Sequence, residues 1–146
     1  MREEVKQKHW SESSVFPVFR LTAPRHNQEF IVLEGDTEDT LLFGPGRAPN
    51  SFLPGDLGTV VIHAYRHFSF LQKIVLNDQI ILNDQLGTEY QYCVLDVSII
   101  DLNKQQIEIA EVDELKLVTP WPFDGATKDN SLRYIVTARK YETYQD

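Results

Sequence analysis

Short stretches of alternating or β-branched residues recur along the whole chain, and turn-forming residues separate them. Typical turn signals are Pro54-Gly55-Asp56, Asn83-Asp84 and Asn103-Lys104. Two segments have helical character, residues 2–10 and 68–74. Closely spaced strands with so few crossover helices predict an all-β fold, either a mostly antiparallel sandwich or a closed barrel. The predicted strands are residues 16–23, 29–35, 40–43, 59–65, 79–83, 88–100, 106–111, 115–119 and 132–142.

The length and the charge narrow the classes of protein that fit. The chain has 146 residues, enough for one domain with a sizeable core. Without a repeat or a linker, residues 15–146 are predicted to form a single domain, preceded by an N-terminal arm over residues 1–14. The net charge of −8 disfavours nucleic acid and anionic membranes as partners. No apolar run approaches the roughly 18 residues that cross a bilayer, so no membrane span is expected in this chain.

The single cysteine, Cys93, excludes an internal disulfide and a thiolate-rich zinc site. Strand alternation places it on one face with Leu95, Val97 and Ile99, which predicts a buried and unreactive thiol. The acidic clusters at residues 34–39 and 111–114 lack the spacing of a calcium loop and are interpreted as solvated turns. Neither a metal nor any other cofactor is expected.

Three segments, taken in order, resemble a sortase, specifically the sortases of marine proteobacteria. Residues 41–62, "LLFGPGRAPNSFLPGDLGTVVI", are similar to the family's Gly-Pro-Gly turn, Pro-Gly and strand. Residues 63–82 are similar to Ala-Gly-His-Arg followed by His-Phe-x-Phe-Leu, and residues 115–138 to Leu-Val-Thr-Cys-Tyr-Pro-Phe followed by Arg-Tyr-x-Val. The resemblance covers roughly residues 15 to 141. It implies a closed, eight-stranded sortase-type β-barrel with one or two short helices.

Sortases cut a sorting-signal peptide and join the new acyl end to an amine, with a cysteine nucleophile, a histidine and an arginine. A thiolate attacks the carbonyl, an acid protonates the leaving amine and a cation supports the charge on oxygen. The resemblance places Pro120 at the cysteine position, Tyr65 at the histidine position and Arg133 at the arginine position. Two of the three catalytic groups are therefore absent, and a nucleophile's loss costs about a million-fold in turnover.

Other residues near these positions are candidates for the cleft: His63, Tyr65, His67, Thr119, Trp121 and Arg133. Thr119 adjoins the lost cysteine, but alternation points it to the face opposite Pro120. His63 and His67 flank Tyr65 and could supply an acid, although His67 packing with Phe68 and Phe70 is favoured. Tyr65 could donate a hydrogen bond to a peptide carbonyl, and Trp121 between two prolines could hold an extended peptide.

These observations predict a catalytically inactive sortase homologue that binds a sorting-signal-like peptide or an envelope protein through the degenerate cleft. Two alternatives stay open: an active, cysteine-independent hydrolase or transpeptidase with relocated catalytic groups, and a barrel kept as a scaffold in a larger assembly. By resemblance alone, the chain is expected outside the cytoplasm, on the periplasmic side of the envelope, with its arm following a membrane anchor that this chain lacks.

Overall fold

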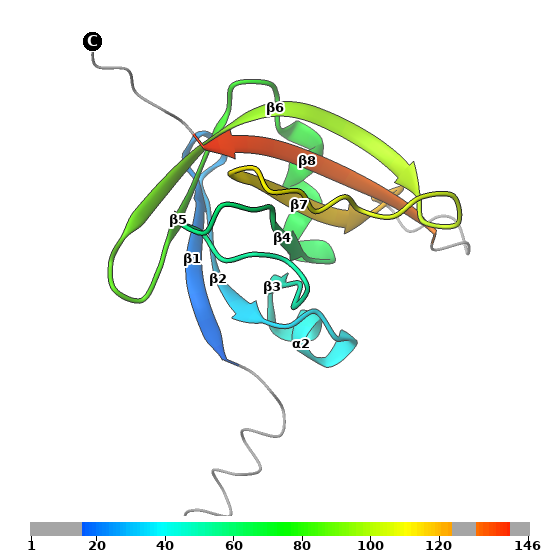
Figure 1. Ribbon diagram of the computed structural model, residues 1–146. Coiled ribbons are helices and arrows are strands. Elements are labelled where there is room, and N and C mark those ends of the chain that lie inside the picture. Colours follow the sequence, from blue (N-terminus) through cyan, green and yellow to red (C-terminus); the bar gives the residue numbers. More distant parts are fainter. Residues whose placement is uncertain (1–15, 124–130, 141–146) are drawn as a thin grey trace, which may run out of the picture.

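The strands form a closed barrel in the order β1-β2-β3-β4-β7-β8-β6-β5, and β5 returns to pair with β1 (Figure 1). The computed structural model describes residues 16–123 and 131–140. Two pairs, β2–β3 and β4–β7, are parallel, and the others are antiparallel. The strands are β1 (Pro17–Ala23), β2 (Gln28–Glu34), β3 (Gly46–Arg47), β4 (Val60–His63), β5 (Gln79–Asn83), β6 (Glu89–Asp101), β7 (Glu114–Pro120) and β8 (Leu132–Lys140).

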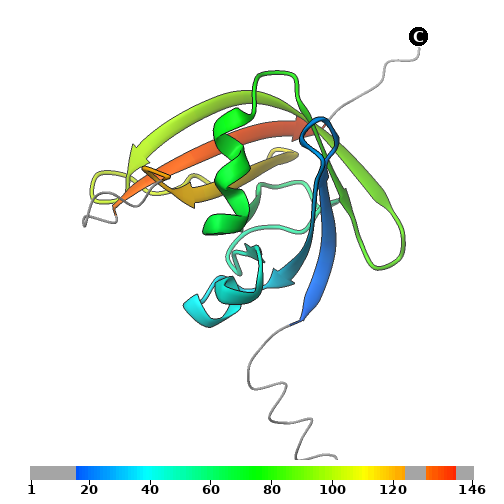
Figure 2. The ribbon, with the colours of Figure 1, turned by 180° about the vertical axis from the view of Figure 1, so that it is seen from behind.

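Three short helical elements connect the strands: η1 (Pro24–His26), α2 (Glu38–Phe43) and η2 (Arg66–Lys73). Seen from behind, η2 crosses the barrel wall at β7 and β8 (Figure 2). Its apolar side chains Phe68, Phe70 and Leu71 are buried there. The expected helix at 68–74 is thus present, as a 3-10 helix with a break at Phe68. The other expected helix, at residues 2–10, and the arm over residues 1–14 lie outside the described residues.

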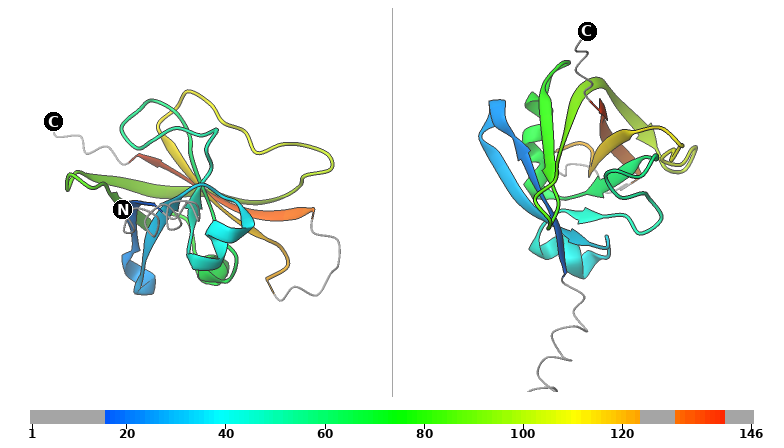
Figure 3. Two further views of the ribbon diagram at one scale, coloured as in Figure 1. Left: turned by 90° about the horizontal axis from the view of Figure 1, so that it is seen from below. Right: turned by 60° about the vertical axis from the view of Figure 1, so that its left-hand side comes forward.

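Two layers of apolar side chains follow from strand alternation. The inner layer fills the barrel that the strands enclose in Figure 3, and includes Leu21, Ile62, Leu82 and Leu117. A second, smaller cluster lies on the outer face of β4, β7 and β8 and consists of Ala48, Val61, Val118 and Ile135. The outer face of this part of the wall is therefore covered by chain rather than by solvent.

The segment predicted as a strand at residues 40–43 is helical in the structure. Thr37 caps α2, because its Oγ1 accepts a hydrogen bond from the Thr40 amide at 3.3 Å. Glu38 and Asp39 lie in the first turn, where the positive end of the helix dipole favours acidic side chains. These local signals at the helix start outweigh the apolar run of residues 40–43.

Residues 106–111 were also predicted as a strand and do not form one. Both edges of β4 are already occupied, by β3 and by β7, so this segment cannot join the sheet there. It runs instead across the outer face, where Ile107 and Ile109 pack against the outer cluster. In Figure 1 this stretch (yellow) passes in front of β7 and β8.

The prediction that Cys93 is buried among apolar neighbours is wrong. Tyr92 and Val94 are the buried residues of this part of β6, each 1% exposed, and Cys93 is half-buried on the opposite face. Its Sγ lies 3.9 Å from Asn77 Oδ1. The error comes from a bulge at Leu95, between Val94 and Asp96, which shifts the alternation by one residue. Beyond the bulge, Val97 packs against the core.

Candidate functional site

The three positions that the sortase resemblance singles out meet at one end of β4, β7 and β8. In the β7–β8 register Pro120 lies directly opposite Arg133. In the parallel β4–β7 pair His63 lies beside Val118, and the Ala64 amide donates to the Val118 carbonyl at 3.1 Å. Tyr65 is the next residue along, so the polypeptide brings it beside the end of β7. Tyr65, Pro120 and Arg133 thus form one row, although Tyr65 is 55 and 68 positions from the other two in the sequence.

Pro120 occupies the middle of this row and shares the outer face of β7 with Val118. It is half-buried. A proline side chain has no nucleophilic atom and no titrating group, and its nitrogen has no hydrogen to donate. Covalent acyl chemistry therefore has no nucleophile at this position.

Thr119, the hydroxyl nearest to Pro120, points to the other face of the strand. It is 3% exposed, and its Oγ1 donates a hydrogen bond to the Tyr65 carbonyl at 3.3 Å. This bond fixes the start of η2 against β7. The Thr119 hydroxyl stabilises the junction and does not face the row at Pro120.

Arg133 contributes a cation to the row from β8, opposite Pro120. One of its donors, Nη1, binds the Leu132 carbonyl at 2.9 Å. Burial lowers the pKa of the Arg133 guanidinium, and the nearby Tyr65 phenol acts in the opposite direction. The side chains at the histidine and arginine positions are therefore close enough to interact, and the guanidinium remains a cation at neutral pH.

His63, two residues before Tyr65, is the last residue of β4 and lies on the outer face of that strand. Its Nε2 is 3.5 Å from Asp36 Oδ2, in the segment that leads into α2. Burial lowers the pKa of His63 below its usual 6.5, the Asp36 carboxylate opposes that shift, and the Arg133 charge adds to it. The imidazole is therefore mostly neutral at pH 7. Sequence patterns gave no reason to pair His63 with Asp36, because the contact depends on how α2 folds.

His67 and Trp121 lie outside this charged group. The His67 ring packs edge-on against Phe30, with centroids 5.9 Å apart, rather than against Phe68 or Phe70 as expected. Its Nδ1 is buried and makes no hydrogen bond to the residues that the structure describes. The Trp121 amide donates to the Leu132 carbonyl at 3.1 Å, and its side chain is half-buried. The backbone of Trp121 thus continues the β7–β8 pairing past Pro120.

A hollow of about 420 Å³ opens on the outer face, and His63 is among the residues that line it. Its floor includes Val61 and Ala48 of the outer cluster, and the β6–β7 segment forms one wall with Ile107 and Ile109. Polar side chains border the hollow and are Asp36, Asn50, His63, Gln105 and Gln106. Of these polar residues, the sequence analysis named only His63 as a candidate, and it missed the contribution of Gln106, Ile107 and Ile109 because it assigned 106–111 to the sheet. In the described ranges, 16–123 and 131–140, no three His, Cys, Asp or Glu side chains are grouped to hold a metal ion.

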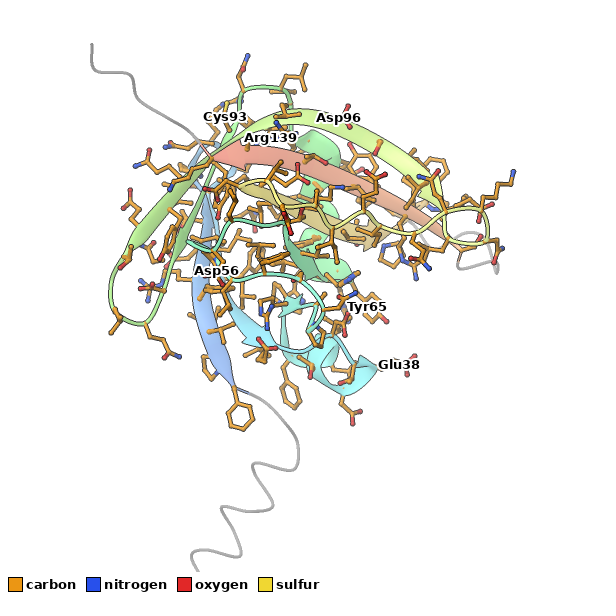
Figure 4. All side chains as sticks on the ribbon, in the orientation of Figure 1. Glu38, Asp56, Tyr65, Cys93, Asp96 and Arg139 are labelled. Atoms are coloured by element: carbon orange, nitrogen blue, oxygen red, sulfur yellow. The ribbon has the colours of Figure 1, made fainter. Side chains whose placement is uncertain are left out.

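A second hollow, of about 340 Å³, lies at Tyr65. Leu41 and Leu42 of α2 line it, together with Tyr65, Arg66 and His67. Figure 4 shows Tyr65 between β4 and α2, whereas Cys93 lies at the far side of the molecule. Tyr65 is 41% exposed and lines this second hollow, whereas it does not line the outer one.

The closed eight-stranded barrel is the fold of one protein class, as comparison with known proteins shows. A family model for the sortase domain matches residues 21–141, and the chain belongs to the sortase family. Both the family and the eight-stranded barrel were predicted from the sequence, and both predictions are confirmed.

The chain is similar to Sortase D of Bacillus subtilis (strain 168), with 28% identity over 124 residues. That match covers 82% of this chain and 62% of the relative, so the chain spans less than two thirds of that protein's length. Among solved structures, sortase A from Corynebacterium diphtheriae has a TM-score of 0.77 at 20% identity, covering 90% of this chain and 64% of that one. A Clostridium perfringens sortase D5 transpeptidase has a TM-score of 0.75 at 21% identity, covering 96% and 89%.

Proposed function

We propose that this protein is a sortase homologue without transpeptidase activity, which binds an extended peptide or protein segment in the outer hollow. The observation that carries the proposal is the pairing of Pro120 with Arg133 in the β7–β8 register, with Arg133 close enough to affect the pKa of His63, which lines the apolar-floored hollow. The nucleophile's position has no reactive atom, while the cation and the concave surface beside it are retained. Such a site can hold a peptide and cannot acylate it.

The described residues offer no ready replacement for the lost thiol. Thr119 faces the interior and donates to a backbone carbonyl. Cys93 lies at the far side of the molecule from Tyr65 (Figure 4). Since covalent catalysis depends on the nucleophile, its loss lowers turnover by about a million-fold, whatever the remaining groups contribute.

The two other hypotheses have less support. An active enzyme with relocated groups would use the His63–Asp36 pair as a base, but that pair needs a nucleophile within reach. If the protein were only a scaffold, we would expect side chains such as Tyr65 or Trp121 to fill the binding surface. The outer hollow is open instead, and neither of these residues lines it. Binding without cleavage is the function that the geometry supports best.

The kind of ligand follows from the lining. Ile107, Ile109 and Val61 offer apolar contacts to alternate side chains of an extended segment, and the polar residues Asn50 and Gln105 can bind its backbone. By analogy with the family, a sorting-signal-like peptide or an envelope protein, met on the periplasmic side of the envelope, is the partner that we infer. Among the described residues no helix is long and apolar enough to span a bilayer.

A titration with sorting-signal peptides followed by ¹H–¹⁵N NMR tests binding. We expect shifts at Val61, His63 and Ile107, and weaker binding in an Ile107→Ser variant, with Leu86→Ser as a control because Leu86 is 90% exposed in the β5–β6 turn. The absence of shifts on the outer face at millimolar peptide would reject the proposal.

A second experiment tests the loss of catalysis. The wild-type chain should form no acyl adduct and should not turn over a quenched-fluorescence sorting peptide. The double variant Tyr65→His, Pro120→Cys restores the thiol and the imidazole beside Arg133, and mass spectrometry should then detect a thioacyl adduct. Turnover by the wild type would support the relocated-group alternative instead.

A further inference from the structure

Strand β6 is much longer than its neighbour β5, and this leaves part of one strand edge uncovered. β5 pairs with β6 only from Glu89 to Cys93. Two further hydrogen bonds, from the Asn77 amide to the Val94 carbonyl and from the Val94 amide to the Asp78 carbonyl, extend that pairing by one residue. Beyond the bulged residue Leu95, β6 pairs with β8 alone from Asp96 to Asp101, within the described parts of the chain. In Figures 1 and 2 this half of β6 forms the upper margin of the molecule.

The direction of each backbone group along this edge can be deduced. Before the bulge, Val94 directs its amide and carbonyl toward the β5 side. After the bulge, the Leu102 amide donates to the Ser131 carbonyl at 2.8 Å, so even-numbered residues face β8. Odd-numbered residues therefore face outward, and the edge presents the amides and carbonyls of Val97 and Ile99. The Asp101 carbonyl already accepts from the Lys104 and Gln105 amides.

The side chains of this edge do little to prevent strand pairing. Leu95 and Ile99 are each 46% exposed. The segment from Val97 to Ile100 has high β-propensity and contains neither proline nor lysine, the residues that commonly block an open edge. An open row of donors and acceptors flanked by exposed apolar side chains is a template for another strand.

We propose that β6 of one molecule pairs with β6 of a second copy in an antiparallel twofold arrangement centred on Ser98. In this register Val97 lies opposite Ile99 of the second copy, and both residues direct their backbone groups across the boundary. Each of the two equivalent pairs forms two hydrogen bonds. The proposal does not depend on what the outer hollow binds.

A second copy fits the edge better than an arbitrary extended segment. The register places Asp96 opposite Ile100 and Asp101 opposite Leu95, so no like charges face each other directly. Because the arrangement is twofold, each copy covers the other's open edge and the assembly closes as a dimer. A pairing of about five residues is small compared with stable interfaces, so we expect weak and concentration-dependent association.

The experiment uses the full chain of 146 residues. Sedimentation equilibrium over increasing concentration should show the mass rising from 16.9 kDa toward twice that value. Ile99→Lys should abolish the rise, because a charge is introduced at the pairing edge. Ile31→Lys is the matched control, since Ile31 on β2 is 47% exposed and lies away from this edge, and it should associate like the wild type.

Amide hydrogen exchange of the wild type gives a test that does not depend on a variant's folding. In dilute solution Val97 and Ile99 should exchange fast, while Ser98 and Ile100 are protected by β8; at high concentration Val97 and Ile99 should become protected too. A monomer at every concentration overturns the proposal, even if another extended segment binds there. So does a dimer that leaves these two amides unprotected, or an unchanged Ile99→Lys dimer.

Discussion

Replacing Arg47 should show how much more a buried ion pair contributes to the stability of this protein than an exposed one. It is 9% exposed in β3, and its Nε and Nη2 donate to the two carboxylate oxygens of Glu34, each at 2.8 Å. Nη1 also donates to the Ser51 carbonyl at 2.8 Å. One side chain therefore joins β2 and β3 to the loop that supplies Asn50 to the outer hollow.

The cost of Arg47→Met can be worked from these contacts. The methionine retains much of the apolar stem, so the loss is chiefly three hydrogen bonds, two of them to a carboxylate. Hydrogen bonds to charged groups contribute roughly 1.5–3 kcal/mol each. Because the Glu34 side chain is 33% exposed, water can solvate it after the change, which reduces the penalty. We expect a loss of about 2–4 kcal/mol in the free energy of unfolding.

The control is Arg20→Met, which removes an ion pair with Glu29 at 3.1 Å whose side chains are 55% and 59% exposed. Exposed pairs contribute about 0–1 kcal/mol. Urea denaturation gives both values, and thermal unfolding should show a drop of about 6–12 °C for Arg47→Met, at about 3 °C per kcal/mol. If the two variants lose the same stability, the reasoning from burial and bidentate geometry is refuted.

Three other predictions concern titration and reactivity. The midpoint of the His63 titration, followed by NMR, should lie below 6.5; it should fall further in Asp36→Asn and rise in Arg133→Met. Because the pKa of His63 is lower in the folded than in the unfolded state, this residue reduces the stability of the fold as pH falls below 6.5. A wild-type midpoint at or above 6.5 would contradict this. Burial raises the pKa of Asp78, but hydrogen bonds from His26, the Val75 amide and Arg25 outweigh it and lower the pKa overall. That stability is present above the ordinary value of 3.8 and is lost as pH falls through the lowered one, so in urea unfolding the deficit of Asp78→Asn should shrink below pH 3.8. Cys93 should be labelled by a maleimide without denaturant, as measured by mass, since its side chain faces outward; labelling only in urea would show that the thiol is buried after all.

Several features could be determined from the sequence because they depend on neighbours along the chain. Alternation located β5 at residues 79–83 and most of β1, β6, β7 and β8, since period-two burial is imposed by the strand itself. The ordered motifs predicted the family and the barrel, while the assignment of Pro120 to the cysteine position stays a prediction. Local helix signals at Thr37 and Glu38 were present too, although the apolar run after them led to a wrong prediction.

Only the tertiary structure decided which of these residues act together. The bulge at Leu95 reverses the face of Cys93, and nothing in the local pattern marks where one extra residue is accommodated. The Asp36–His63 contact and the wall formed by residues 106–111 depend on strand order, because β4 is already paired on both edges. The open edge of β6 likewise depends on two strands having different lengths. Pairing between distant segments is selected by the packing of the whole barrel, which a reading of one segment at a time does not contain.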